Sequence, residues 1–148
     1  MRDPDPMRFT NTVVIDRPPA LVFAYLADLE NLPRWNYAIQ ETRKITSGPV
    51  KVGSRYRQTR TVPVRSEESV EVTEYDPGRR LTITGTLGAF PAQLTYALDP
   101  AGSATRLTNT VDLTPPRPLR LLAPLATHRV SAAVAANLEV LKHLLEQA

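Results

Sequence analysis

The sequence contains no cysteine and only two histidines, His128 and His143. The first absence excludes disulfides, thiolate zinc sites, iron–sulfur clusters and cysteine nucleophiles. Two histidines are too few for a histidine metal cluster, and no HExxH motif or Ser-His-Asp triad can be assembled. We therefore expect no metal site.

Glycine is scarce, with six residues in the chain. The stretch GTLGAF, residues 85–90, matches neither the dinucleotide-binding fingerprint nor a phosphate-binding loop. Nucleotide and hydride chemistry are therefore unsupported, and we expect no cofactor.

Long apolar runs and charge of one sign are missing as well. No run of 18 apolar residues occurs, and the opening MRDPDPMRFT lacks the apolar core of a secretory signal. A cytoplasmic protein is the expectation. The net charge is +3, and the basic residues are interleaved with acids such as Glu67, Glu68, Glu71 and Glu74. Nucleic acid is an improbable partner, because its binding requires a clustered basic surface.

The length of 148 residues suits one domain, which would bury roughly two thirds of its unfolded surface. Hydrophobic residues make up 42% and charged residues 22% of the chain, which is typical of globular rather than disordered proteins. We predict a single domain over residues 1–148, with residues 1–7 as a flexible tail.

Alternating, β-branched segments separated by proline or glycine predict an antiparallel meander. Between the first strand and the rest, residues 20–32 have helical periodicity, with Pro18 and Pro19 suited to a first turn and Pro33 ending the helix. The predicted strands are 8–16, 38–46, 53–62, 66–76, 80–87, 91–99 and 104–114.

The C-terminal segment predicts a short helix before Pro124 and a long one after it, because proline interrupts a helix. His128 and His143 point away from the apolar face of the long helix, so we expect them to be exposed. That apolar face is predicted to carry Thr127, Val130, Val134, Asn137, Leu138, Leu141, Leu144 and Leu145.

These elements predict an α+β fold in which a strongly curved seven-stranded antiparallel sheet wraps around the long C-terminal helix. The sheet and the helix each have one apolar face to bury, and each buries it against the other. One helix cannot fill such a curved sheet, so an internal cavity between them is expected.

Four stretches carry a family resemblance: RPPALVFAYLADLENLPRW, VGSRYRQT, VTEYDPGRRL and GSATRLTNTV. With the order of elements they resemble the START-like or SRPBCC superfamily, in particular its polyketide cyclase/dehydrase-like branch, over residues 8–146. The resemblance implies a helix-grip fold with a hydrophobic ligand cavity. It does not imply one reaction, because the superfamily includes cyclases, aromatases and lipid carriers.

Strand parity predicts which residues face inward. Tyr56, Gln58 and Arg60 share one face of their strand, and Glu68 lies on the inward face of the next strand. If the letters PVR form a three-residue hairpin loop, Arg60 lies opposite Glu68. The polar residues predicted to point inward are Gln58, Arg60, Glu68, Asn109 and Asn137.

Buried polar groups need partners, and a ligand is one of them. Two alternatives remain open. Arg60 and Glu68 pair with each other across strands, or they act on a ligand, Glu68 as an acid and Arg60 by stabilising an enolate or binding a carboxylate. Asn109 and Asn137 satisfy each other, a loop carbonyl or water, or they contact the ligand.

Aromatic residues present a similar choice between packing and binding. The hydroxyls of Tyr25, Tyr56 and Tyr96 either complete the core or orient a substrate carbonyl. Trp35, the only tryptophan, is expected to shape the pocket rather than to react.

Three functions are compatible with these features. The first is binding of a hydrophobic small molecule, such as a lipid, polyketide or isoprenoid, in the cavity. The second, based on the resemblance, is a cofactor-independent cyclase or dehydratase. The third is an interaction module in which PRPLRLLAPL, residues 116–125, contacts a membrane surface or another protein. The sequence does not indicate an oligomeric state.

Overall fold

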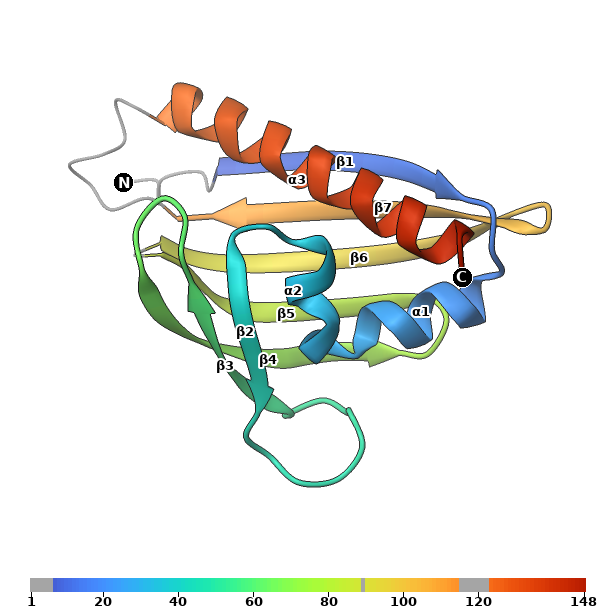
Figure 1. The fold of residues 1–148 in the computed structure, drawn as a ribbon, viewed down its shortest axis with the longest axis horizontal. Helices are drawn as coiled ribbons and strands as arrows, with labels where there is room; N and C mark the ends of the chain where they lie inside the picture. The colour runs from blue at the N-terminus through green and yellow to red at the C-terminus, as the bar shows by residue number, and fades with distance from the viewer. Residues whose placement is uncertain (1–6, 89, 115–122) are drawn as a thin grey trace, which may run out of the picture.

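The computed structural model describes residues 7–88, 90–114 and 123–148, the first four of the last range as backbone only. One antiparallel sheet has the strand order β1-β7-β6-β5-β4-β3-β2 (Figure 1). Each predicted strand is present, with ends that differ by a few residues. The strands are β1 (Met7–Ile15), β2 (Ile39–Lys44), β3 (Arg55–Arg60), β4 (Ser66–Asp76), β5 (Arg80–Leu87), β6 (Phe90–Ala101) and β7 (Ala104–Leu113).

Buried and exposed side chains alternate along the strands, so one face of the sheet is buried and the other faces solvent, as is common in antiparallel sheets. In β7 the alternation is complete: Leu107, Asn109, Val111 and Leu113 are buried, and the residues between them are not. Met7, which we expected in a flexible tail, is already the first residue of β1. Residues 1–6 of that predicted tail lie outside the described residues.

The helix predicted for 20–32 is in fact three shorter elements: α1 (Pro19–Ala27), the 3-10 turn η1 (Leu29–Asn31) and α2 (Leu32–Trp35). Asp28 separates the first two, and its side chain accepts a hydrogen bond from the Glu30 backbone N–H. Pro33 therefore does not end the predicted helix. It lies in the first turn of α2, where the missing N–H of proline costs no hydrogen bond.

The long helix α3 (Ala123–Glu146) lies across β1 and β7 on the inner face of the sheet (Figure 1). Pro124 is in its first turn, and the short helix predicted before Pro124 falls on residues outside the described ranges, as does most of the proposed contact segment 116–125. The predicted apolar face is correct at Asn137, Leu138, Leu141 and Leu145, which are buried. It is wrong at Leu144, which is exposed because it lies at the rim of that face.

The β3–β4 hairpin differs from the predicted register. Its loop has five residues, 61–65, so Arg60 pairs with Ser66 and Gln58 pairs with Glu68. The predicted register, with Arg60 directly opposite Glu68, is therefore wrong by two positions, although the two side chains still form an ion pair at 2.8 Å. The Thr61 N–H donates to the carbonyl of Ala38 on the β2 side, so this residue belongs to the loop rather than to the β4 ladder. A shift of two keeps the parity, so the inward face is as predicted.

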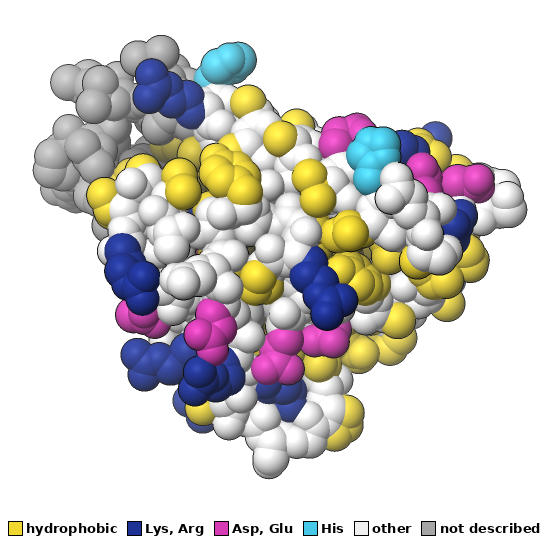
Figure 2. Space-filling model, viewed as in Figure 1, with side chains coloured by type: hydrophobic (Ala, Val, Ile, Leu, Met, Phe, Trp, Pro, Cys, Tyr) yellow, Lys and Arg dark blue, Asp and Glu magenta, His cyan; other side chains and the backbone are white. Residues whose placement is uncertain are grey.

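The surface agrees with the expected mixture of charges. On the face shown in Figure 2, basic and acidic side chains alternate rather than forming a patch of one sign. His128 and His143 are exposed, as predicted. No helix within the described ranges combines the length and apolarity needed to cross a bilayer.

Candidate functional site

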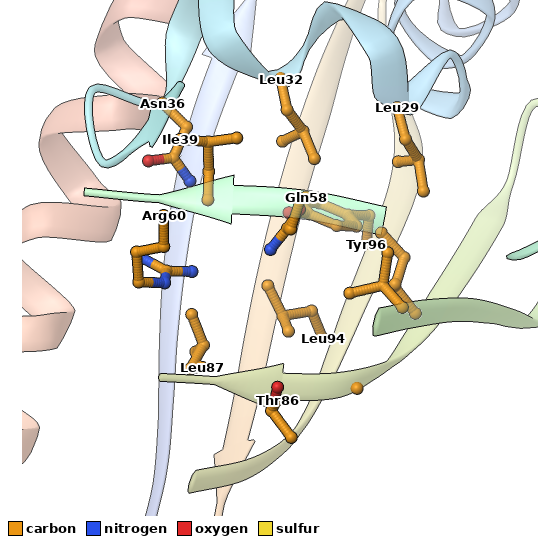
Figure 3. A pocket seen from close by; sticks show the side chains of 13 residues that line it. Leu29, Leu32, Asn36, Ile39, Gln58, Arg60, Thr86, Leu87, Leu94 and Tyr96 are labelled. Carbon is orange, nitrogen blue, oxygen red and sulfur yellow. The ribbon is translucent and has the colours of Figure 1, made fainter. Parts of the chain in front are cut away.

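A cavity of about 50 Å³ lies between the short helical segment η1–α2 and the inner face of the sheet (Figure 3). It is partly open to solvent. Residues from η1, α2, β2, β3, β4, β5 and β6 line it: Leu29, Leu32, Asn36, Ile39, Gln58, Arg60, Val70, Ile83, Gly85, Thr86, Leu87, Leu94 and Tyr96.

This position differs from the predicted one. We expected the hollow between the sheet and the long helix, but no described residue of α3, β1 or β7 lines it. Leu138, Leu141 and Leu145 of α3 are packed in the main hydrophobic core, to which several lining residues, among them Leu29 and Leu32, also belong. Because these leucines fill the space under α3, the remaining hollow lies under the short helices.

Apolar side chains form most of the wall, from Leu29 and Leu32 above to Leu87 and Leu94 below (Figure 3). Gly85 of β5 also lines the cavity, and no larger residue fits at this position. A Cβ at this position would lie 2.5 Å from the backbone oxygen of Ser69 and 2.8 Å from Cγ1 of Val70. Only glycine therefore permits this close approach of β4 and β5.

Gln58 and Arg60, from the inward face of β3, give one end of the cavity its polar character. Both are buried, at 6% and 7% exposure. Each is held by Glu68 of β4: Gln58 Nε2 donates to Glu68 Oε1 at 2.7 Å, and Arg60 Nε donates to Glu68 Oε2 at 2.8 Å. The two predicted polar faces thus meet, although Glu68 reaches Arg60 diagonally.

Glu68 itself is covered completely, with a side-chain exposure of 0%, and does not line the cavity. Oε2 also accepts hydrogen bonds from the Ser66 hydroxyl at 3.3 Å and from the Gly88 backbone N–H. Both carboxylate oxygens are therefore engaged. Four donors from this chain therefore hold the buried carboxylate in place.

One fully buried polar atom of the lining has no hydrogen-bond partner among the described residues. The carbonyl oxygen Oε1 of Gln58 is buried and accepts no hydrogen bond from any described residue. Buried acceptors in folded proteins are nearly always paired with protein, water or ligand. This oxygen is therefore free to accept a hydrogen bond from a group outside the chain, such as water or a ligand.

Tyr96 and Trp35 lie together at the inner end of the site. Tyr96 lines the cavity, and its ring meets that of Trp35 edge to face, with centroids 6.5 Å apart and planes at 82°. Trp35 is buried but does not line the cavity. It supports the wall from behind, and burial raises the pKa of the Tyr96 hydroxyl well above that of free tyrosine.

The other predicted tyrosines lie away from the cavity. Tyr56 is buried in the main core, and its hydroxyl has no partner among the described residues. Burial, with smaller contributions from Asp28 and Glu30, raises the pKa of Tyr56 to about 12. Tyr25 is half-buried and packs against the same core.

Asn109 and Asn137 are buried but do not line the cavity. Asn109 donates from Nδ2 to the Thr95 carbonyl at 3.2 Å, and its Oδ1 is without a partner within the described residues. Asn109 is paired in register with Tyr96. No hydrogen bond joins the two asparagines in the described part of the chain, so their predicted mutual pairing is not observed.

Alternation along the strands identified inward-facing residues in the sequence, but cavity residues that this alternation did not point to were missed. Leu29, Leu32 and Asn36 come from the helical segment, and Thr86 and Leu87 come from the end of β5. The break at Asp28 and the proline at 33 were the available signals that this segment would cross the sheet as short pieces. In the described ranges, no group of three or more acids or histidines is arranged to hold a metal ion.

Solved structures establish the fold. TTHA0849 from Thermus thermophilus is 22% identical with a TM-score of 0.77, and the alignment covers 93% of this chain and 96% of that one. The Zhui aromatase/cyclase from Streptomyces sp. R1128 is 14% identical with a TM-score of 0.75, and the alignment covers 95% of this chain and 93% of that one. Ara h 8.0201 is 15% identical with a TM-score of 0.70, and the alignment covers 95% of this chain and 98% of that one.

None of the curated proteins compared with the sequence matches it. A family match is nevertheless extensive, because residues 6–146 match the family described as polyketide cyclase / dehydrase and lipid transport. This span includes every described helix and strand, and it agrees with the resemblance to the SRPBCC superfamily. The chain therefore belongs to the polyketide cyclase / dehydrase and lipid transport family.

Proposed function

We propose that this protein binds a hydrophobic small molecule in the cavity under η1 and α2. The observation that carries the proposal is a largely apolar hollow that is also lined by two buried polar side chains, Gln58 and Arg60. Oε1 of Gln58 has no hydrogen-bond partner among the described residues. Binding sites for small molecules typically combine apolar walls with a few placed polar groups. The family description, which includes lipid transport, supports the same proposal.

The size of the cavity sets a condition on binding. A volume of about 50 Å³ holds only a few water molecules, since one water needs roughly 10–15 Å³ of such space. Pockets for organic ligands are typically some hundreds of Å³. We therefore expect the walls to move apart when a ligand enters. The half-buried side chains of Leu87 and Leu94 turn aside, and the short elements η1 and α2 move away from the sheet.

A filled cavity tests the proposal. Leu94→Phe adds a ring to the wall, and Leu21→Phe makes the same change at an exposed position of α1 that does not line the cavity. Thermal shifts and native mass spectrometry against fatty acids, isoprenoids and aromatic polyketides are expected to identify binders. Leu94→Phe should weaken their binding at least tenfold, whereas Leu21→Phe should not. Equal binding by the two variants would place the ligand elsewhere.

A second candidate function is a cyclase or dehydratase reaction, favoured by the family description and by the Arg60 guanidinium at the cavity. A shaped apolar pocket accelerates such a reaction by holding a flexible chain in one reactive conformer. Arg60 would stabilise a developing enolate oxygen. Glu68 is engaged at both oxygens, which favours a supporting role over acid–base transfer.

Turnover of a polyketide-like substrate tests this second candidate. Arg60→Ala is expected to abolish most of the activity, and Glu68→Gln to reduce it by loosening Arg60 and Gln58. If both variants kept the full rate, these residues would have no part in the reaction.

A further inference from the structure

The orientation of the Gln58 amide is fixed by its neighbour. A carboxylate only accepts hydrogen bonds, so the Gln58 group that faces Glu68 Oε1 at 2.7 Å must be the NH₂. The carbonyl oxygen then points away from Glu68, and it is the atom without a partner at the cavity among the described residues. Glu68 therefore makes Gln58 present an acceptor, rather than a donor, to whatever enters.

Arg60 is oriented in the same way. Its Nε donates to Glu68 Oε2 at 2.8 Å, and no described residue accepts a hydrogen bond from its terminal nitrogens. Figure 3 shows the guanidinium beside the cavity, on the same side of β3 as the Gln58 side chain. A guanidinium presents its remaining N–H groups as a planar fork that suits carboxylate or carbonyl oxygens.

The two groups lie side by side. Gln58 and Arg60 are two residues apart on one strand, which separates their backbones by roughly 7 Å. Both side chains converge on the two oxygens of the single Glu68 carboxylate, which brings their polar ends closer than their backbones. A ligand that meets both needs a donor and an acceptor only a few bonds apart.

Resting on the proposed function, we propose that the cavity selects an apolar molecule whose head carries a hydroxyl near a carboxylate or carbonyl oxygen, as in a 3-hydroxy acid. The hydroxyl donates to Gln58 Oε1, and the carboxylate or carbonyl accepts from Arg60. Glu68 is the positioning residue that gives the two side chains these opposite roles. The apolar remainder of the ligand lies against Leu32, Ile83 and Leu94.

Matched probes test the assignment on the wild-type protein. Octanoate, 3-hydroxyoctanoate and 3-methoxyoctanoate share a chain and a carboxylate, but only the second has a hydroxyl donor. The (R) and (S) hydroxy acids are titrated separately. Trp35, the only tryptophan, reports binding by fluorescence because its ring contacts Tyr96 at the cavity. We expect one enantiomer of 3-hydroxyoctanoate to bind about tenfold more tightly than octanoate and 3-methoxyoctanoate. This is the size of effect expected when one hydrogen bond is made to a buried acceptor that otherwise has no partner among the described residues.

Variants assign the preference to residues. Gln58→Met keeps the length of the side chain and removes the acceptor, so the preference for the hydroxy acid should disappear while octanoate affinity changes little. Glu68→Gln, which no longer dictates the amide orientation, should reduce the ratio of the two affinities. The matched control is Thr59→Val on the opposite face of β3, where the hydroxyl bonds Glu67, and it should keep the ratio.

The ratio of affinities separates the outcomes. A variant that merely loosens the pocket weakens both acids and leaves their ratio unchanged. Equal binding of all three acids by the wild type, or a preference that survives Gln58→Met, overturns this inference and leaves the proposed function standing. If no acid binds the wild type, this inference is overturned as well, and the proposed function is then decided by the isoprenoids and aromatic polyketides of the wider panel.

Discussion

Arg60→Met removes the positive member of the buried ion pair and keeps an apolar side chain of similar length. The two side chains are almost fully covered, with a side-chain exposure of 9% for Arg60 and 0% for Glu68. Removing one partner of a buried ion pair typically costs about 3–5 kcal/mol, because the other charge stays buried and uncompensated. Single domains are stable by only about 5–15 kcal/mol, so this loss should be large but measurable in a folded variant.

Urea denaturation followed by far-ultraviolet circular dichroism and by Trp35 fluorescence measures this loss. The matched control is Arg80→Met, which breaks an exposed pair with Glu74 at 2.6 Å, with exposures of 50% and 47%. Exposed pairs contribute about 1 kcal/mol or less, so this variant should remain close to the wild type.

The double variant Arg60→Met/Glu68→Leu separates the charge effect from packing. It leaves no isolated charge, so it should be at least about 2 kcal/mol more stable than the sum of the two single losses predicts. Strict additivity, or a loss in Arg60→Met no larger than in Arg80→Met, would refute the reasoning that the pair is buried and mutually dependent.

Three further predictions concern the core. Gly85→Ala should lower the free energy of unfolding by about 1–3 kcal/mol in urea, because its Cβ would overlap the Ser69 carbonyl. Tyr56→Phe should raise it by about 1 kcal/mol, since the buried Tyr56 hydroxyl has no partner in the described structure. In an alkaline titration followed by tyrosinate absorbance, Tyr56 should ionise near pH 12, and Tyr56→Phe should remove that step. The pKa of Tyr56 is about 12 in the folded protein and 10.0 in the unfolded chain, so its full contribution to the free energy of unfolding is present below pH 10. Between pH 10 and 12 only the unfolded chain loses the proton, so the free energy of unfolding falls by up to about 1.4 kcal/mol per pH unit.

The sequence predicts the sheet and its inward face well because these depend on a short-range signal. Alternation along a strand places Gln58 and Arg60 on the side of Tyr56, and nothing distant is needed to infer it. The same rule placed Glu68 inward on β4, and the structure confirms that these polar side chains meet. The arrangement of the sheet around α3 was inferred from the one apolar face that each has to bury, and the family resemblance implied the same arrangement.

The exact register and the position of the hollow depend on tertiary contacts that the local pattern does not contain. A three-residue and a five-residue loop both preserve parity, and the observed choice involves the hydrogen bond from Thr61 to Ala38. The cavity lies under η1 and α2 because the leucines of α3 fill the space beneath that helix. Leu29 and Leu32 could therefore be assigned to the core from the sequence, but not to a binding site.

The two halves of the interior are held in different ways, which determines where the site is able to open. Under α3, buried leucines are supported by hydrogen bonds from Asn11 to Ser131 and from Lys142 to the Val14 carbonyl, which tie the helix to β1. Over the cavity, the covering elements are only three and four residues long, and short elements depend on their packing for stability. Enlargement of the cavity therefore requires displacement of η1 and α2, because movement of α3 would first have to break the better anchored half of the core.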